Sequence, residues 1–240
     1  MTKEDGKETA TMVFMIPLEP APKRLELLQG LAAQILALPV PPVLKVGIDG
    51  VDGAGKTTFS TELAEVLAAS GRPMIRASVD GFHNPRAVRY RLGKRSPEGF
   101  FRDSYNYGAL KAALLDPLNP GGTGRYRTAV FDHRMDAPVE VPEQQAAPGS
   151  ILLVDGIFLH RPELRAYWDL SVFLEVDFGT SIPRGAQRGE GSPDPHAPEN
   201  RRYVEGQRLY LQECHPREHA SVVVNNERLE RPFIVPNKGF

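Results

Sequence analysis

Eight consecutive residues, Gly50 to Thr57, read G-x-x-x-x-G-K-T and could bind phosphate. Glycines let the backbone curl so that successive N–H groups point at one small volume, and the following helix offers its positive end. Lys56 could then reach the β- and γ-phosphates of a triphosphate, and the Thr57 hydroxyl could bind Mg²⁺. The sequence therefore predicts a site for ATP and Mg²⁺. Its expected ligands are Gly50, Asp52, Gly53, Ala54, Gly55, Lys56, Thr57 and Thr58.

Two carboxylates at predicted strand ends could complete a reaction centre. Asp155 ends the apolar run I-L-L-V-D, where it could hold the Mg²⁺ ion together with Thr57. Asp80, in S-V-D-G-F-H, ends the strand after the glycine loop, and open α/β sheets bind their ligands at such ends. Its carboxylate could accept the proton of an acceptor hydroxyl. Each aspartate could instead be an ordinary turn residue.

Arginines flank a loop rich in glycine and proline, residues 189–200. A mobile lid over the site would bring such cations to the transferred phosphoryl group, where they would offset its developing charge. Arg188 is favoured for this catalytic role because it lies nearest the loop, and Arg184 is the second candidate. Either side chain could instead lie on a solvated helix face.

The elements around these residues alternate between strands and helices. Strands are predicted over 43–48, 73–79, 125–132, 151–159, 170–176 and 220–224, with helices over 23–38, 56–70, 85–92, 108–115, from about 180 onward, and 200–214. This order predicts an α/β fold with a mostly parallel sheet. Residues 1–22 are predicted to be a flexible arm, and residues 23–240 a single domain that begins with an amphipathic helix.

The composition argues against several function classes. The 240 residues carry a formal net charge of −1, so neither general nucleic-acid binding nor attachment to a membrane surface is expected. The apolar run near the start, Met12 to Ile16, is too short for a secretion signal, and Cys214 is the only cysteine. A cytoplasmic protein is expected, with a small-molecule partner and the possibility of a homo-oligomer.

Three classes of protein share the glycine loop. A GTPase switch would carry an N-K-x-D guanine reader, but the nearest match, N-K-G-F at the end of the chain, lacks the aspartate. A motor ATPase needs partner domains for which this chain has little room. A small-molecule kinase needs a base, phosphoryl donors and a lid, and the sequence offers candidates for all three.

Four stretches in this order, GIDGVDGAGKTT, VDGFH, GFFRDSYNYGAL and LLVDGIFL, resemble the phosphoribulokinase/uridine kinase family of P-loop kinases. The resemblance implies the three-layer P-loop NTPase fold, with a mostly parallel five-stranded sheet, flanking helices and a mobile lid. It also implies transfer of the γ-phosphate of ATP to a small hydroxyl compound, with Asp80 as the base and His83 beside the acceptor.

The acceptor is less clearly indicated. Uridine kinases carry an aromatic residue at the position of His83, and N-F-D where this chain has N-Y-G at 106–108. The segment SPEGFFRDSYNYGAL also resembles bacterial pantothenate kinases. The favoured acceptor is a nucleoside, and a pantothenate-like compound, another small metabolite or a non-catalytic nucleotide-binding regulator are the alternatives. The acceptor-pocket candidates are His83, Arg89, Tyr105, Tyr107, His133 and Arg134.

Overall fold

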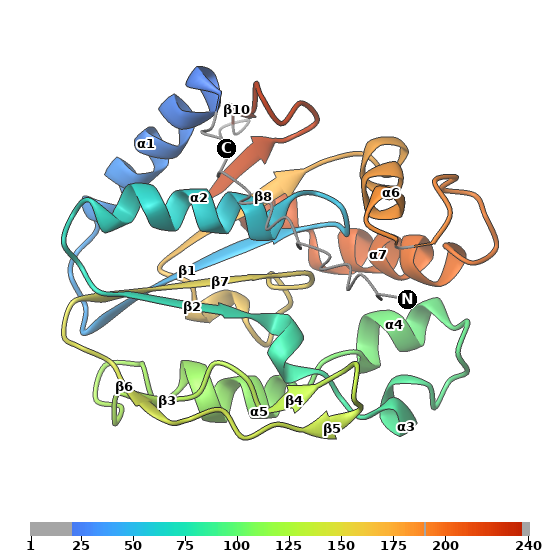
Figure 1. Ribbon diagram of the computed structural model, residues 1–240, viewed down its shortest axis with the longest axis horizontal. Helices are drawn as coiled ribbons and strands as arrows, with labels where there is room; N and C mark the ends of the chain where they lie inside the picture. The colour runs from blue at the N-terminus through green and yellow to red at the C-terminus, as the bar shows by residue number, and fades with distance from the viewer. Residues whose placement is uncertain (1–20, 190, 237–240) are drawn as a thin grey trace, which may run out of the picture.

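A computed structural model describes residues 21–189 and 191–236 of the chain (Figure 1). Its centre is a six-stranded sheet in the order β10-β9-β8-β1-β7-β2. The strands are β1 (Val43–Gly50), β2 (Met74–Ser78), β7 (Ser150–Gly156), β8 (Leu170–Glu175), β9 (Val222–Asn225) and β10 (Phe233–Ile234). All neighbours are parallel except β10, which runs antiparallel to β9. The predicted parallel α/β sheet is therefore confirmed, and β10 is an addition at its edge.

Helices cover both faces of this sheet, which gives the three layers that the sequence predicts. Helices α1 (Pro22–Leu36) and α2 (Lys56–Ala68) lie on one face (Figure 1). The other face carries α4 (Pro97–Asp103), α5 (Tyr107–Leu110), a π-helical turn over Lys111–Leu115, and α7 (Arg201–Cys214). The remaining helices are α3 (Arg86–Arg89), α6 (Phe178–Gln187) and α8 (Pro216–His219).

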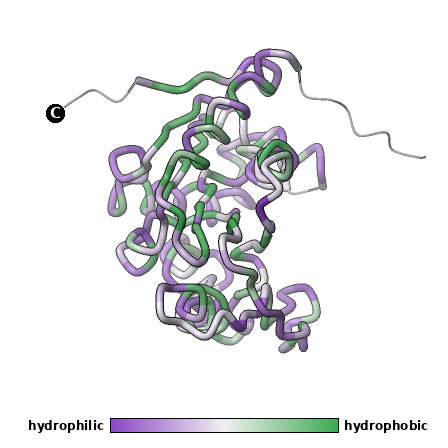
Figure 2. Tube along the Cα trace, turned by 90° about the vertical axis from the view of Figure 1, so that its left-hand side faces the viewer, coloured by the Kyte–Doolittle hydropathy of each residue, from purple (hydrophilic) through white to green (hydrophobic). Residues whose placement is uncertain are grey.

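The central strands are apolar because both of their faces are covered. Every residue of β1 and of β7 is buried. Successive side chains point to opposite faces, so Val46 and Ile48 pack on one layer of helices while Val43 packs on the other. Figure 2 shows hydrophobic segments running through the middle of the molecule, with hydrophilic segments outside.

Local signals explain where the two helices on the first face begin and end. Pro22 occupies the first turn of α1, where its missing N–H costs nothing, and Leu28, Leu31 and Ile35 form its buried stripe. Helix α1 therefore begins one residue before the predicted helix. Residues 1–20 of the predicted flexible arm lie outside the described residues. Helix α2 buries Phe59, Leu63 and Leu67 in the same layer.

Two predictions about the middle of the chain need correction. The strand predicted over 125–132 does not join the main sheet. It is two short pieces, β3 (Arg125–Tyr126) and β4 (Phe131–Asp132), which pair with β6 (Gln144–Gln145) and β5 (Ala137–Pro138). Between the pieces the chain turns to meet the 3₁₀ turn after β2, where the Val130 amide donates to the Gly81 carbonyl over 2.9 Å. The helix predicted over 85–92 is only the single turn α3, whereas α4 was not predicted, although Ser96 caps it and Pro97 begins it.

The long helix α7 lies so close to α4 that the contact requires a glycine. A Cβ added at Gly206 would lie 2.7 Å from the Pro97 carbonyl oxygen and 2.8 Å from the Phe100 ring. No described helix is long and apolar enough to cross a membrane.

Replacing Gly206 with alanine should destabilise the protein by about 1–3 kcal/mol, because the added methyl group forces α7 away from α4. The free energy of unfolding from urea titration would measure this. Gly30→Ala is the matched control, since nothing lies within 4 Å of its added Cβ. That substitution should stabilise α1 by about 0.5–1 kcal/mol through helix propensity. Equal effects of the two substitutions would contradict the packing argument.

Candidate active site

The glycine loop, residues Gly50–Thr57, joins the end of β1 to the start of α2. Gly53 and Gly55 have φ angles of +74° and +89°, the left-handed region that side chains rarely adopt. A Cβ at Gly53 would also lie 2.0 Å from the Ser181 carbonyl oxygen, so the loop fits closely under α6. The Lys56 ammonium turns back to the Val51 carbonyl oxygen at 2.9 Å. The arrangement leaves the loop beside the N-terminus of α2, where backbone donors favour anions.

A buried polar cluster of Asp49, His160 and Tyr210 holds the start of this loop. The Asp49 carboxylate accepts from the Gly50 amide over 2.7 Å and from His160 Nδ1 over 2.6 Å. It also accepts a short hydrogen bond from the Tyr210 hydroxyl on α7. Burial, followed by the Asp49 charge, raises the pKa of Tyr210 well above its ordinary value, so the phenol remains a donor. Asp49, His160 and Tyr210 were not among the predicted site residues, although an aspartate inside the apolar strand V-G-I-D-G was a signal for the cluster.

Thr57 and Asp155 meet across the sheet edge, as the metal-site prediction requires. The Thr57 hydroxyl donates to Asp155 Oδ2 over 2.9 Å, and Asp155 is only 5% exposed. Desolvation raises the pKa of this carboxyl, against the opposing effects of Thr57 and Lys56. Within the described residues, no cluster of three or more histidine, cysteine or acidic side chains could hold a metal by itself. One hydroxyl and one desolvated carboxylate instead fit Mg²⁺, which binds few protein groups alongside phosphates and water.

Asp80 faces the same space from the neighbouring strand. It lies in the 3₁₀ turn Val79–Phe82 that follows β2, and its side chain is 61% exposed. Tyr105 donates its hydroxyl to Asp80 Oδ1 over 3.0 Å, and His83 Nε2 lies 3.6 Å from that oxygen. Desolvation raises the pKa of Asp80, but His83, Tyr105 and Lys56 together outweigh it and lower that pKa below its ordinary value. The carboxylate is therefore ionised near neutral pH.

One cleft of about 290 Å³ collects most of the predicted residues. It contains the glycine loop, both carboxylates and Arg188, which follows the last residue of α6. Its lining residues are Asp52, Gly53, Gly55, Lys56, Thr57, Thr58, Ser78, Asp80, Tyr105, Asp155, Gly156, Ile157 and Arg188. Gly50 and Ala54 belong to the same loop but are buried and do not line the cleft.

Arg184 lies elsewhere. Its guanidinium donates to the carbonyl oxygens of Asn226, over 3.1 Å, and Glu227, over 2.6 Å. Desolvation lowers its pKa. The side chain thus supports the segment after β9, and it is not among the residues that line the cleft.

A larger cavity of about 620 Å³ adjoins the cleft at Asp52, which lines both. His133 and Arg134, from the turn between β4 and β5, form one wall. The opposite wall comes from α6, α7 and the loop between them, with Tyr203 and Asn200 among its residues. His83 joins the cleft to this wall, because its ring lies 4.4 Å from that of Tyr105 and 4.6 Å from that of His133. The predicted acceptor residues Tyr105, His83 and His133 are thus neighbours, and Arg134 follows His133 in the chain.

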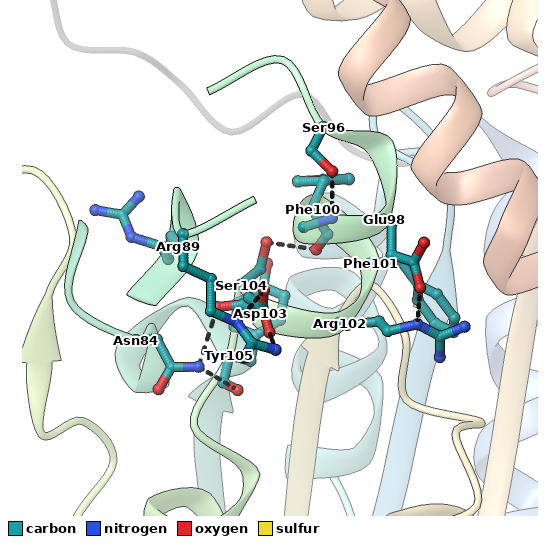
Figure 3. A network of polar contacts seen from close by, with 12 residues as sticks. Asn84, Arg89, Ser96, Glu98, Phe100, Phe101, Arg102, Asp103, Ser104 and Tyr105 are labelled. Atoms are coloured by element: carbon teal, nitrogen blue, oxygen red, sulfur yellow. Dashed lines mark hydrogen bonds and ion pairs between the residues drawn. The ribbon is translucent and has the colours of Figure 1, made fainter. Parts of the chain in front are cut away.

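Hydrogen bonds of Asn84 and Ser104 fix the chain at the end of α4, next to Tyr105 (Figure 3). The Asn84 side-chain amide donates to the carbonyl oxygens of Asp103 and Tyr105 over 3.0 and 2.9 Å. The Ser104 hydroxyl donates to Phe100, and the Ser104 carbonyl oxygen lies 3.0 Å from His83 Nδ1. Because that carbonyl can only accept, His83 Nδ1 carries a proton.

Three predicted acceptor residues line neither cavity: His83, which contacts Tyr105 and His133, and the residues Arg89 and Tyr107. Arg89 is 8% exposed, and its guanidinium donates to Asp136 Oδ1 over 3.0 Å and to the His133 carbonyl oxygen over 3.4 Å. It therefore shapes the wall that carries His133. The Tyr107 ring packs under the Arg161 guanidinium at 4.8 Å, and its buried hydroxyl has no hydrogen-bond partner among the described residues. Its side chain belongs to the core.

A model of the Phosphoribulokinase / Uridine kinase family matches residues 45–189, more than half of the chain. The chain belongs to this family. The match begins in β1 and spans the glycine loop, Asp80, Asp155 and Arg188, so it includes the residues that meet in the cleft. It leaves out α1, α7 and the segment after β9.

Individual relatives agree with this membership. A uridine kinase of Leuconostoc citreum (strain KM20) is 24% identical over 159 residues, which cover 60% of this chain and 68% of that protein. The structure of a possible uridine kinase from Bacillus stearothermophilus matches with a TM-score of 0.65 and 24% identity, over 83% of this chain and 96% of the other. A putative fructose transport system kinase from Silicibacter sp. TM1040 has a TM-score of 0.62 and 23% identity, over 79% and 94%. These two solved structures therefore have the same fold as this chain.

Tyr105→Phe should raise the pKa of Asp80, because it removes a hydrogen bond that favours the ionised carboxylate. NMR titration of the Asp80 carboxyl carbon measures this pKa without any assumption about the reaction. Tyr203→Phe is the control, because Tyr203 lies on the far wall of the larger cavity. An unchanged or lowered pKa in Tyr105→Phe would show that the hydroxyl does not stabilise the carboxylate.

Proposed function

We propose that this protein is an ATP- and Mg²⁺-dependent kinase that transfers the γ-phosphate to a hydroxyl group of a small metabolite, with a nucleoside as the favoured acceptor. The observation that carries the proposal is the convergence of Asp80 with Lys56, Thr57 and Asp155 on one cleft. Family membership supports phosphotransfer to a small molecule. The acceptor is argued below from the larger cavity.

The glycine loop holds the triphosphate in this proposal. Its backbone amides and the N-terminus of α2 bind phosphate oxygens, and the Lys56 ammonium exchanges the Val51 carbonyl for the β- and γ-phosphates. Thr57 and Asp155 would hold Mg²⁺, which would supply positive charge to offset that of the triphosphate. Arg188 offsets the charge on the transferred phosphoryl group from the rim of the cleft.

Asp80 orients the acceptor hydroxyl and takes its proton. The acceptor oxygen forms a bond to the γ-phosphorus, the bond from that phosphorus to the bridging oxygen of ADP breaks, and the proton passes to Asp80. Its lowered pKa keeps the carboxylate ionised before the reaction. Tyr105 aims the carboxylate through its hydroxyl, so positioning contributes more than base strength.

The larger cavity favours a flat, partly polar acceptor. His133 and Tyr203 offer ring faces, with the His83 ring next to that of His133, while Arg134 and Asn200 offer hydrogen-bond donors. A nucleoside matches both features, since its base stacks on rings and its sugar carries the hydroxyl. The names of the uridine kinase relatives favour the same class. The loop between α6 and α7 borders this cavity, which agrees with the proposed lid role of the segment.

Asp80→Asn should lower kcat by at least about 10²-fold, the lower range for loss of a general base. The dissociation constant for Mg·ATP should stay within about twofold, because Asp80 binds the acceptor rather than the phosphates in this proposal. Coupled ADP release measures kcat, and calorimetry measures ATP binding. Asp116→Asn is the control, because Asp116 lines neither cavity. Wild-type turnover in Asp80→Asn would end the assignment of Asp80 as the base.

The acceptor class is tested by ADP release from Mg·ATP with uridine, cytidine, nicotinamide riboside, pantothenate, glycerate and fructose. We expect a strong response to a nucleoside and almost no turnover without an acceptor, since a kinase must keep water from its phosphoryl group. A response to pantothenate or a sugar would replace the nucleoside with that class. ATP binding with no response to any compound would favour a regulator or an acceptor outside the panel.

A further inference from the structure

Two parts of the chain that the family model does not match touch each other beside the glycine loop. One is α1, near the beginning of the chain, and the other is the segment 226–229 that follows β9. Arg24 of α1 joins them. Its side chain is almost fully buried, with the residue 4% exposed, which is unusual for a charged group on an outer helix.

The Arg24 guanidinium makes three kinds of contact at once. Its Nε donates to Glu62 Oε2 on α2 over 2.7 Å. Its Nη1 donates to Asn226 Oδ1 over 3.0 Å and to the Leu229 carbonyl oxygen over 3.1 Å. The planar fork of arginine suits such a set of acceptors, whereas the single ammonium of lysine does not.

Asn226 carries the contact onward to the glycine loop. It is fully buried, and its side-chain amide donates to the Ala54 carbonyl oxygen over 2.7 Å. A Cβ added at Gly55 would lie 3.2 Å from Asn226 Nδ2 and 3.6 Å from Leu229 Cδ2. Segment 226–229 therefore lies directly against the loop that is proposed to bind the phosphates. Arg184 holds the same segment from α6.

Segment 226–229 also carries an apolar side chain, Leu229. The residue is 39% exposed, and its Cδ2 would lie 3.6 Å from a Cβ added at Gly55 of the glycine loop. A nucleotide with its phosphates on the loop also carries a flat aromatic base, whose faces favour apolar contacts. An exposed leucine at this place would supply a surface for the base to cover.

We propose that Arg24 is a positioning residue for nucleotide binding, which holds segment 226–229 against the glycine loop so that Leu229 packs on the base. This inference rests on the proposed binding of ATP. It makes α1 a supporting part of the nucleotide site. Loss of the guanidinium would free the segment, and the bound base would lose its apolar contact.

Arg24→Ala should raise the dissociation constant for Mg·ATP and the KM for ATP by about tenfold, the effect of losing one or two hydrogen bonds that hold a binding surface. The kcat and the KM for the acceptor should be unchanged. A purely structural role would instead lower the active fraction, and thus the apparent kcat, without changing the KM for ATP. Arg24→Lys should restore little, because lysine cannot reach both Asn226 and Leu229 while facing Glu62.

Two matched controls separate the positioning role from general support of α1. Glu62→Gln removes the ion pair between α1 and α2 but leaves the bonds from Arg24 to segment 226–229, so ATP binding should stay within about twofold of wild type. Gln29→Ala changes an exposed residue of α1 and should have no effect.

Leu229→Ser keeps the test valid if Arg24→Ala does not fold. It should weaken Mg·ATP but leave the affinity for Mg²⁺-tripolyphosphate unchanged, because that ligand has no base. Wild-type ATP affinity in Arg24→Ala, or equal losses for ATP and tripolyphosphate in Leu229→Ser, would overturn the inference. If the wild-type protein bound no nucleotide at all, the proposed function itself would fail. ATP binding by calorimetry needs no acceptor, so the two failures are distinguishable.

Discussion

The buried carboxylate of Asp49 is the constraint on which the site depends. It is fully buried at the end of the central strand, and a charge in that position is costly unless donors surround it. Those donors come from three separate places: the Gly50 amide at the start of the glycine loop, His160 after β7, and Tyr210 on α7. The cluster thus ties the loop to the next strand and to the helix that borders the larger cavity.

The parallel sheet then brings the remaining chemistry to the same edge. Strands β1, β7 and β2 are neighbours and run in one direction, so the residues at their carboxyl ends meet. Asp155 reaches Thr57 directly, and Asp80 takes its place opposite them in the cleft. Each carboxylate has a different environment. Desolvation raises the pKa of Asp155, whereas His83, Tyr105 and Lys56 outweigh desolvation and lower that of Asp80, so the two carboxyl groups of one cleft differ in their affinity for protons.

The parts that were predictable from the sequence are those whose signals are local. The glycine loop, the apolar strands and the helix stripes are each written in a few adjacent residues, and the structure contains them. Residues that depend on distant partners were not found or were misplaced. Tyr107 looks like a pocket aromatic in sequence, but packing under Arg161 places it in the core. The segment 125–132 has the composition of a strand, but it does not pair with β2 at the edge of the main sheet. Its two halves instead pair with β6 and β5 in separate two-stranded sheets. Arg184 satisfies carbonyl groups more than 40 residues away, which no spacing rule reveals.

The bonds between Arg24 and segment 226–229 also constrain the order in which the protein can be completed. They join residues 202 and 205 positions apart, and nearly the whole chain lies between them. During synthesis, α1 is made before segment 226–229, so Arg24 can bond to Asn226 and Leu229 only after that segment has been made. Contacts of such sequence separation form late because the intervening loop must first be closed. Until segment 226–229 has been synthesised, Arg24 therefore lacks two of the three hydrogen-bond acceptors that it has in the folded protein.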